Sequence, residues 1–100
     1  MAYAITHFWP GATQEQYERE IRALHPADGS LPLGQLFHAA GTTEGGIFIM
    51  AVHESQESWE TFRDQVVIPM SAQVVDGFPA PPVERDVELF HVFPDHILGD

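Results

Sequence analysis

The sequence predicts an α+β domain with the element order β-α-β-β-α-β, and three observations lead to this prediction. A helix-start pattern follows the first apolar segment, and a glycine-rich turn joins the next two apolar segments. A second helical pattern then precedes a last segment of alternating character. The chain has 100 residues, which suits one compact core, so residues 1–100 are expected to form a single domain.

The first two elements are a strand and a well-marked helix. Residues 2–9 are rich in aromatic and β-branched side chains and end at a Pro-Gly pair, which is typical of a strand. Thr13 and Gln16 have the spacing of a capping box, in which each side chain bonds a free backbone N–H of the other. The helix should end near His25, because a proline follows. Its apolar face consists of Tyr17, Ile21 and Leu24.

A loop over residues 27–34 leads into a predicted hairpin. Residues 35–40 and 47–53 read as its two strands, and the Thr-Thr-Glu-Gly-Gly sequence between them supplies turn residues. The second of these strands is apolar on both faces over residues 47–52. This composition is typical of a central strand that is covered on both sides.

The second half of the chain predicts a helix, a connector and a strand. Ser55 can cap a helix whose apolar positions are Trp59, Phe62 and Val66. Pro69 should break or kink this helix, and a further helical piece should end at Gly77. The proline-rich residues 78–82 predict an extended connector, and residues 83–93 predict a long last strand with Val87, Leu89, His91 and Phe93 on one face.

This order is the split βαβ pattern of ferredoxin-like folds, with a four-stranded antiparallel sheet. Both helices should cover the same face of the sheet. The other face, which includes the apolar strand 47–52, then needs a cover of its own. Sheet-to-sheet packing of two copies would supply one, so we predict a homodimer that forms an α/β barrel.

The charge of the chain limits its partners. The formal net charge is −11, with 15 acidic residues against four arginines. Nucleic acids and anionic membrane surfaces both require a basic surface, so neither is an expected partner, and a small hydrophobic or aromatic molecule is easier to accommodate. The chain has no Cys, no signal-peptide pattern at its N-terminus and no apolar run of membrane-spanning length. We expect a cytoplasmic protein.

Histidine is the unusual residue, with six in the chain. Four lie on predicted strands: His7, His38, His53 and His91. If the hairpin turns at residues 44–45, His38 faces Ala51, and if the turn is one residue later it faces His53; either register puts His38 and His53 on one face. His7 and His53 are expected to end parallel neighbouring strands and to share one mouth of the sheet.

Any of these four histidines is a candidate catalytic base, because imidazole titrates near neutral pH. One of them could deprotonate a phenol or enol, whose carbanion would react with dioxygen, or could act on a polyketide in a cyclisation. The alternative is that they make local hydrogen bonds or lie at a dimer interface. The expected cavity lining is Trp9, Phe37, Trp59, Phe62 and Phe90.

Two passages carry a resemblance to a known family. The end of the first strand, Thr-His-Phe-Trp-Pro-Gly at residues 6–11, and the passage Ala-Val-His-Glu-Ser-Gln-Glu-Ser-Trp-Glu-Thr-Phe at residues 51–62 are similar to the dimeric α/β-barrel superfamily. That superfamily includes antibiotic-biosynthesis monooxygenase-like and stress-responsive A/B-barrel proteins. The resemblance implies a homodimer and a cofactor-free monooxygenase or cyclase for a phenolic or polyketide-like substrate, with no cofactor.

Two further functions stay open. One is a ligand-binding or accessory protein with the same pocket and no turnover. The other is a haem or metal protein that uses a strand histidine, with Glu54 or Glu88 as an added metal ligand. Haem-degrading members of the superfamily carry a haem-ligating His on the second helix, whereas residues 66–70 here read Val-Val-Ile-Pro-Met. No His-x-His spacing occurs, so no metal site is predicted.

Overall fold

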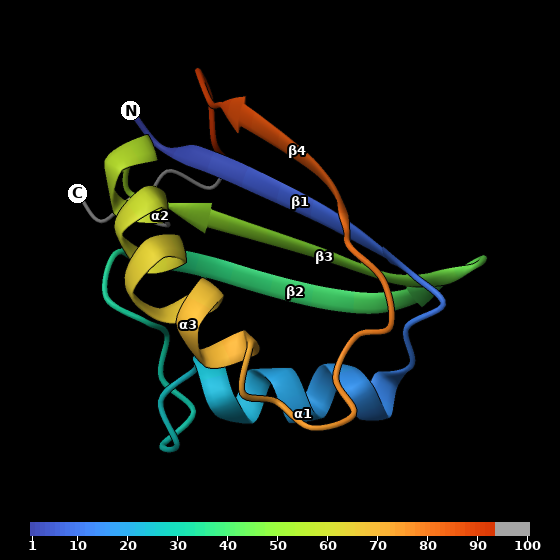
Figure 1. Cartoon of the computed structure of the whole chain (residues 1–100). Coiled ribbons are helices and arrows are strands. Elements are labelled where there is room, and N and C mark those ends of the chain that lie inside the picture. Colours follow the sequence, from blue (N-terminus) through green and yellow to red (C-terminus); the bar gives the residue numbers. More distant parts are fainter. Residues whose placement is uncertain (94–100) are drawn as a thin grey trace.

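The computed structural model describes residues 1–93 and has one four-stranded antiparallel sheet with its helices on one face (Figure 1). The strand order is β2-β3-β1-β4. This arrangement confirms the predicted α+β ferredoxin-like fold. The elements are β1 (Tyr3–Pro10), α1 (Gln14–Leu24), β2 (Gln35–Thr43), β3 (Gly46–His53), α2 (Gln56–Phe62), the π-helical turn η1 (Arg63–Val67), α3 (Ile68–Ser71) and β4 (Val83–Glu88).

Helix α1 begins at the predicted capping box. The backbone N–H of Gln16 donates to the Thr13 hydroxyl at 3.2 Å, and the Thr13 N–H donates to the Gln16 side-chain oxygen at 2.9 Å. His25 caps the other end in an extended conformation, as the following Pro26 requires. The helix therefore spans the predicted residues.

The hairpin adopts the first of the two predicted registers. Thr43 pairs with Gly46, and His38 faces Ala51. The irregular pairing between Gln35 and Phe37 then shifts the register by one residue toward the end of β3. The expectation of parallel central strands is wrong, because β1 and β3 are antiparallel. In an antiparallel pair the two strands end at opposite edges, and His7 faces Ile49 instead of lying beside His53.

Gly46 begins β3 where the backbone of β1 comes closest. A Cβ added at Gly46 would collide with the carbonyl oxygen of Trp9, which is backbone and has little freedom to move. We expect Gly46→Ala to lower the free energy of unfolding by about 2–3 kcal/mol, measured by urea denaturation. Gly41→Ala on β2 is the matched control, since nothing lies within 4 Å of its Cβ position. Equal stability of the two variants would contradict this account.

The second helical segment bends without a break. Pro69 has no N–H, and its ring excludes a regular α-helical turn before it. The helix therefore widens into the π-helical turn η1, in which the Ile68 N–H donates to the Arg63 carbonyl. The prediction that the helix ends at Gly77 is wrong. Helix α3 ends at Ser71, and Asp76 rather than Gly77 takes the left-handed conformation, with φ of 56°.

The last strand is shorter than predicted. Strand β4 stops at Glu88, so the expectation that His91 and Phe93 lie on a strand is wrong. The Leu89 N–H still donates to the carbonyl of Ala2 at 3.0 Å, and Ala2 directly precedes the first residue of β1. Beyond Glu88 no residues of β1 remain to pair with, because β1 starts at Tyr3, the partner of Glu88. The His91 and Phe93 rings instead lie against each other, with centroids 4.1 Å apart.

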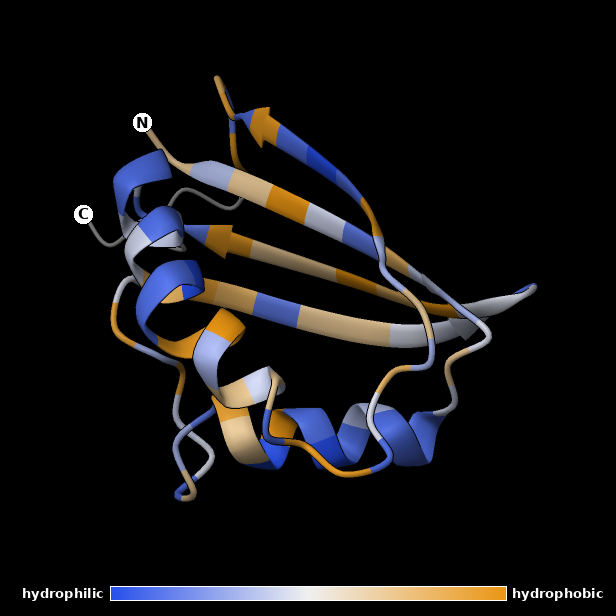
Figure 2. Ribbon diagram, in the orientation of Figure 1, coloured by the Kyte–Doolittle hydropathy of each residue, from blue (hydrophilic) through white to orange (hydrophobic). Residues whose placement is uncertain are grey.

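The core lies between the sheet and the second helical segment. Its buried cluster is Tyr3, Ile5, Trp59 and Phe62, with Val66 and Val67 packed against it. Figure 2 shows hydrophobic stretches along β1 and β3 and many hydrophilic residues on the helices. No helix in the described range is long and apolar enough to cross a membrane.

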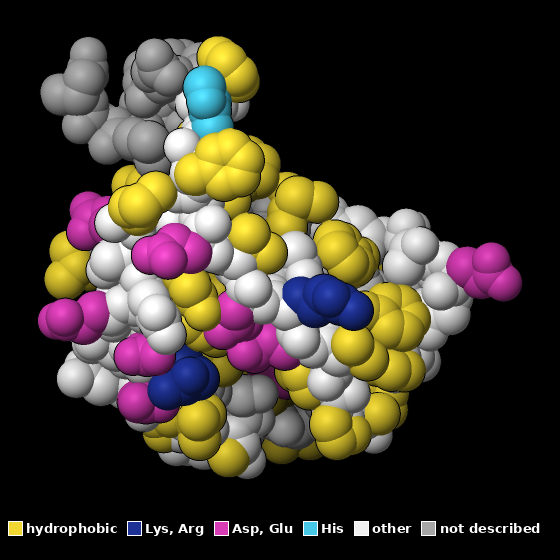
Figure 3. Space-filling view, turned by 90° about the horizontal axis from the view of Figure 1, so that it is seen from above, with side chains coloured by type: hydrophobic (Ala, Val, Ile, Leu, Met, Phe, Trp, Pro, Cys, Tyr) yellow, Lys and Arg dark blue, Asp and Glu magenta, His cyan; other side chains and the backbone are white. Residues whose placement is uncertain are grey.

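The opposite face of the sheet has no cover within residues 1–93. Strand pairing arranges its side chains in three rows, which we call the open face: Phe37, Val52, Ala4 and Val87; Ala39, Met50, Thr6 and Arg85; and Gly41, Phe48, Phe8 and Val83. Arg85 is the one charged residue in these rows. Seen from above, hydrophobic side chains gather on the right-hand side of the molecule (Figure 3). Met50, near the middle of the face, is 44% exposed.

Candidate functional site

A cavity of about 540 Å³ lies between the sheet and the helices. Alternate residues of the central strands, Ile5, Ile49 and Ala51, form an apolar floor, because β1 and β3 turn these side chains toward the helices. Aromatic walls come from β1, α2 and the connector before β4: Trp9, Trp59, Phe62 and Phe78. A volume of this size lies within the usual range for small-molecule sites.

His7 lies on the wall of this cavity beside a carboxylate. Its Nε2 is 2.8 Å from Oε1 of Glu84, which the β1–β4 register places directly opposite. A carboxylate oxygen accepts, so Nε2 carries the proton and a neutral His7 ring has its lone pair on Nδ1. The ring lies between two indoles, with centroids 5.9 Å from Trp9 and 5.8 Å from Trp59. Glu84 therefore fixes the ring in an orientation suited to a base.

His38 faces the same cavity from the outer strand β2. Its Nε2 is 2.6 Å from the Tyr17 hydroxyl, and the His25 ring packs against it edge-on, with centroids 4.7 Å apart. Burial, with a smaller contribution from His25, lowers the pKa of His38 to about 4. Burial also lowers the pKa of His25 and raises that of Tyr17. His38 is therefore neutral near pH 7, and its low pKa makes it a weak base at that pH.

His53 is fully buried and does not line the cavity. Both ring nitrogens have partners: Nε2 lies 3.3 Å from Nε2 of Gln35, and Nδ1 lies 3.1 Å from the Ser58 hydroxyl. These contacts connect β2, β3 and α2, and burial lowers the pKa of His53 to about 4. The position of His53 thus favours the alternative of local hydrogen bonding.

The two low histidine pKa values predict acid sensitivity. His38 and His53 have pKa values near 4 when folded, below the ordinary 6.5, so the unfolded chain binds protons first as the pH falls. The two histidines should contribute their full share to the free energy of unfolding above pH 6.5. This contribution should be lost between pH 6.5 and 4, by about 1–2 kcal/mol per histidine after solvent screening. Urea denaturation across this range measures it. His38→Gln should flatten the curve of unfolding free energy against pH, and His91→Gln should leave it as in wild type. Identical curves for the wild-type protein and both variants would contradict this prediction.

Three buried polar atoms of the cavity lining have no hydrogen-bond partner among the described residues. They are Nε1 of Trp9, Nε1 of Trp59 and Oε1 of Gln35. Buried polar atoms are normally bonded, since each unmade bond costs free energy. Two N–H donors and one carbonyl acceptor of the lining residues thus have no partner within the described chain.

The predicted lining is only partly brought together. Trp9, Trp59 and Phe62 line the cavity as expected. Phe37 does not, because its strand register places it on the open face, 41% exposed. Phe90 and His91 lie beyond the end of β4, and Phe90 is 92% exposed, so neither joins the cavity.

Several lining residues were absent from the predicted site: Tyr17, His25, Gln35, Phe78 and Glu84. A signal existed for His25, because it follows Ile21 by four residues and so continues the apolar face of α1. Glu84 is found only through the pairing of β1 with β4, a contact between distant parts of the chain.

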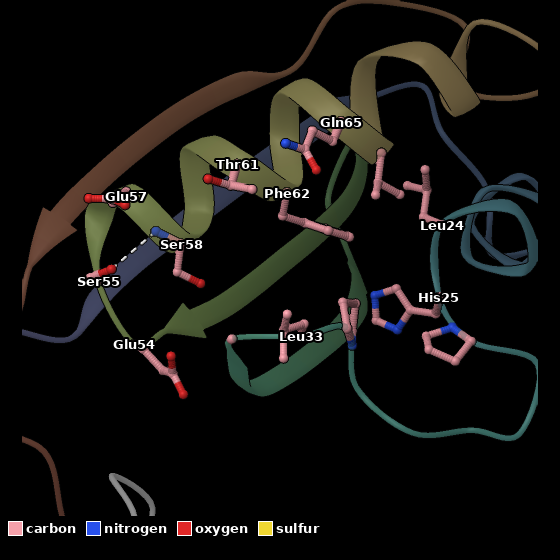
Figure 4. Close-up of a pocket in the computed structure, with 14 residues that line it drawn as sticks. Leu24, His25, Leu33, Glu54, Ser55, Glu57, Ser58, Thr61, Phe62 and Gln65 are labelled. Carbon is pink, nitrogen blue, oxygen red and sulfur yellow. Dashed lines mark hydrogen bonds between the residues drawn. The ribbon is translucent and has the colours of Figure 1, made fainter.

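A second hollow, which we call the outer groove, adjoins the cavity and has a volume of about 640 Å³ (Figure 4). Ser58, Thr61 and Phe62 of α2 stand on one side of the outer groove, with His25 and Leu33 across from them. Leu24, His25 and Phe62 line both spaces. These three side chains are thus the partition between cavity and groove.

The described residues contain no set of ligands that would support the alternative of a metal protein. Within residues 1–93, no group of three or more His, Asp or Glu side chains is arranged to hold a metal ion. Glu54, suggested as a metal ligand, lies in the outer groove.

Comparison with solved structures confirms the fold. Rv0793 from Mycobacterium tuberculosis is similar with a TM-score of 0.61 and 13% identity, over 92% of this chain and 97% of that one. SnoaB from Streptomyces nogalater, a cofactor-independent oxygenase solved as a mutant, is similar with a TM-score of 0.60 and 9% identity, over 94% of this chain and 97% of that one. A candidate antibiotic biosynthesis monooxygenase from Chloroflexus aurantiacus J-10-fl is similar with a TM-score of 0.51 and 20% identity, over 92% of this chain and 98% of that one.

These likenesses bear out, at the level of fold, the predicted resemblance to antibiotic-biosynthesis monooxygenase-like proteins. No protein-family model matches the sequence, and no curated protein matches it either.

Proposed function

We propose that the chain is a cofactor-independent monooxygenase for a hydroxylated aromatic, polyketide-like substrate that binds in the cavity. The observation that carries the proposal is the meeting of an oriented histidine and unpartnered N–H donors in one apolar cavity. A phenolic ring system would fill the apolar space and offer oxygen atoms to the indole N–H groups. The neighbouring fold of SnoaB, itself a cofactor-independent oxygenase, supports this kind of chemistry.

The proposed reaction begins at His7. Its Nδ1 removes a proton from the acidic ring CH₂ of the substrate, and Glu84 stabilises the resulting imidazolium. The carbanion gives electrons to dioxygen and forms a C–O bond, which leaves a peroxide that takes up the proton. Loss of the second C–H proton with cleavage of the O–O bond yields a carbonyl and water. One dioxygen is consumed, with one oxygen atom in the product and one in water.

A test is oxygen uptake with 1,8-dihydroxy-9-anthrone, which should give 1,8-dihydroxyanthraquinone and water. The expected result is an enzyme-dependent rate well above that of buffer, with one quinone formed per dioxygen consumed. If the anthrone binds but its oxidation is no faster than in buffer, the oxygenase proposal fails. A binding protein without turnover would then account for the cavity. Ring closure of a polyketide mimic without oxygen uptake would instead indicate the cyclase.

We propose further that a second copy of the chain covers the open face. Twelve residues form this face, and among them Arg85 is the one charge, although the chain has 15 acidic residues. Glu84, Asp86 and Glu88 all lie on the helix side of β4 instead, as their partners on β1 indicate. A face kept free of the dominant charge suits contact with another copy, which would be equally acidic elsewhere.

A further inference from the structure

A buried carboxylate stands in the wall of the cavity. Glu20 of α1 is only 4% exposed and lines the cavity. It lies three residues after Tyr17 and four before Leu24, in the middle of the apolar stripe that turns α1 toward the sheet. Such a position normally holds an apolar residue, because burying a carboxylate is costly unless it is paired.

The pairing of Glu20 is incomplete. Its partner in the described part of the chain is the Ser71 hydroxyl, 3.1 Å from Oε1 and 3.0 Å from Oε2. One hydroxyl donates one proton, whereas a carboxylate has about four acceptor positions. The nearby cations are engaged elsewhere: Arg19 binds Glu15 and the Asp76 carbonyl, and Arg63 binds Asp64.

The remaining charges around the cavity do not offset Glu20. Glu84 is paired with His7, and Arg63 with Asp64. His25 and His38 have lowered pKa values and are neutral near pH 7. The interior is thus negative, and Gln35 adds a second acceptor, Oε1, without a donor.

We infer that Glu20 determines specificity: the cavity selects uncharged ligands that present an O–H donor and rejects ligands that carry a carboxylate. The inference rests on the proposed function of the cavity as a ligand site. A hydroxyl of the ligand supplies the donor that Glu20 and Gln35 lack, while the ligand's carbonyl oxygens meet the indole N–H groups. A second carboxylate inside the cavity is repelled by Glu20, and this repulsion is strong because little water screens it.

Three 1,8-dihydroxyanthraquinones test this inference, since they differ only at carbon 3, which carries hydroxymethyl, methyl or carboxylate. Calorimetric titration of the wild-type protein should show the hydroxymethyl and methyl compounds binding at least about tenfold more tightly than the carboxylate. Glu20→Gln keeps the shape and the Ser71 contact but removes the charge. We expect it to reduce that ratio to about threefold or less, mainly through tighter binding of the carboxylate.

Two further variants serve as references. Glu18→Gln removes the same charge from the exposed face of the same helix, and the wild-type ratio should persist. Ser71→Ala keeps the Glu20 charge and removes its donor, so the ratio should stay as large as in wild type or become larger. If Glu20→Gln does not fold, a ratio that falls in Ser71→Ala overturns the inference, because this variant retains the Glu20 charge.

The outcomes separate this inference from the proposed function. An unchanged ratio in Glu20→Gln, or a ratio lost equally in Glu18→Gln, overturns the inference and leaves Glu20 a structural residue. Failure of all three compounds to bind overturns both. Selective binding that depends on Glu20, in a protein that does not consume oxygen, supports the inference and overturns only the oxygenase proposal.

Discussion

Replacing His7 by Gln should lower the rate of anthrone-dependent oxygen uptake by about a hundredfold or more, because the amide cannot take a proton from the substrate. Substrate affinity should change little, since Gln retains much of the ring's polar character while Trp9 and Trp59 remain. Glu84→Gln should give a smaller loss of about tenfold, because the amide oxygen can still orient the ring but no longer carries the charge that stabilises the imidazolium. Oxygen-electrode rates with 1,8-dihydroxy-9-anthrone measure both effects.

His91→Gln is the matched control, because it removes the same group from an exposed position outside the cavity. Its rate should equal that of wild type. The assignment of His7 is wrong if His7→Gln retains more than about a third of the wild-type rate in a folded protein. His38→Gln would then be the next variant to measure, because His38 faces the same cavity.

Placing Glu at position 50 should convert a dimer into a monomer. Met50 lies in the middle row of the open face, opposite Thr6 and Ala39. An isologous sheet-to-sheet contact would bury two such carboxylates at a cost of several kcal/mol, because Arg85, the one cation in the rows of this face, lies two strands away on β4. Sedimentation equilibrium should give twice the chain mass of 11.2 kDa for wild type and the chain mass itself for Met50→Glu.

Gln14→Glu is the corresponding control. It adds the same charge at the exposed start of α1, where a negative charge is favourable, and should leave the dimer intact. A wild-type protein that sediments at 11.2 kDa at all concentrations would contradict the proposed covering of the open face by a second copy.

The parts of the fold that follow from local rules were predictable. The capping box at Thr13 and Gln16 places the start of α1, and the glycine-rich turn places the hairpin. Pro69 marks a disturbance of the second helix, but whether the chain breaks or widens depends on packing, and here it widens into η1. The end of β4 was beyond such rules. Alternation continues past Glu88 in the sequence, whereas the strand stops where β1 offers no further partner.

The candidate site was harder to predict, because it depends on which face each strand turns toward the helices. His7, Trp9 and Trp59 were found from residue type alone. Phe37 was misplaced because it directly precedes the cavity-facing His38, and regular alternation along β2 puts it on the open face. The shift between Gln35 and Phe37 instead turns Gln35 toward the helices, which a regular count would not give. Glu84 needed the pairing of two strands that are far apart in the sequence.

A crystal structure of the protein with 1,8-dihydroxyanthraquinone tests the central claim most directly. The account predicts the ring system above Ile5 and Ile49, with ligand oxygens within hydrogen-bond distance of the indole N–H of Trp59 and of Nδ1 of His7. A ligand bound only in the outer groove or on the open face, with the cavity closed by its own side chains, would contradict it.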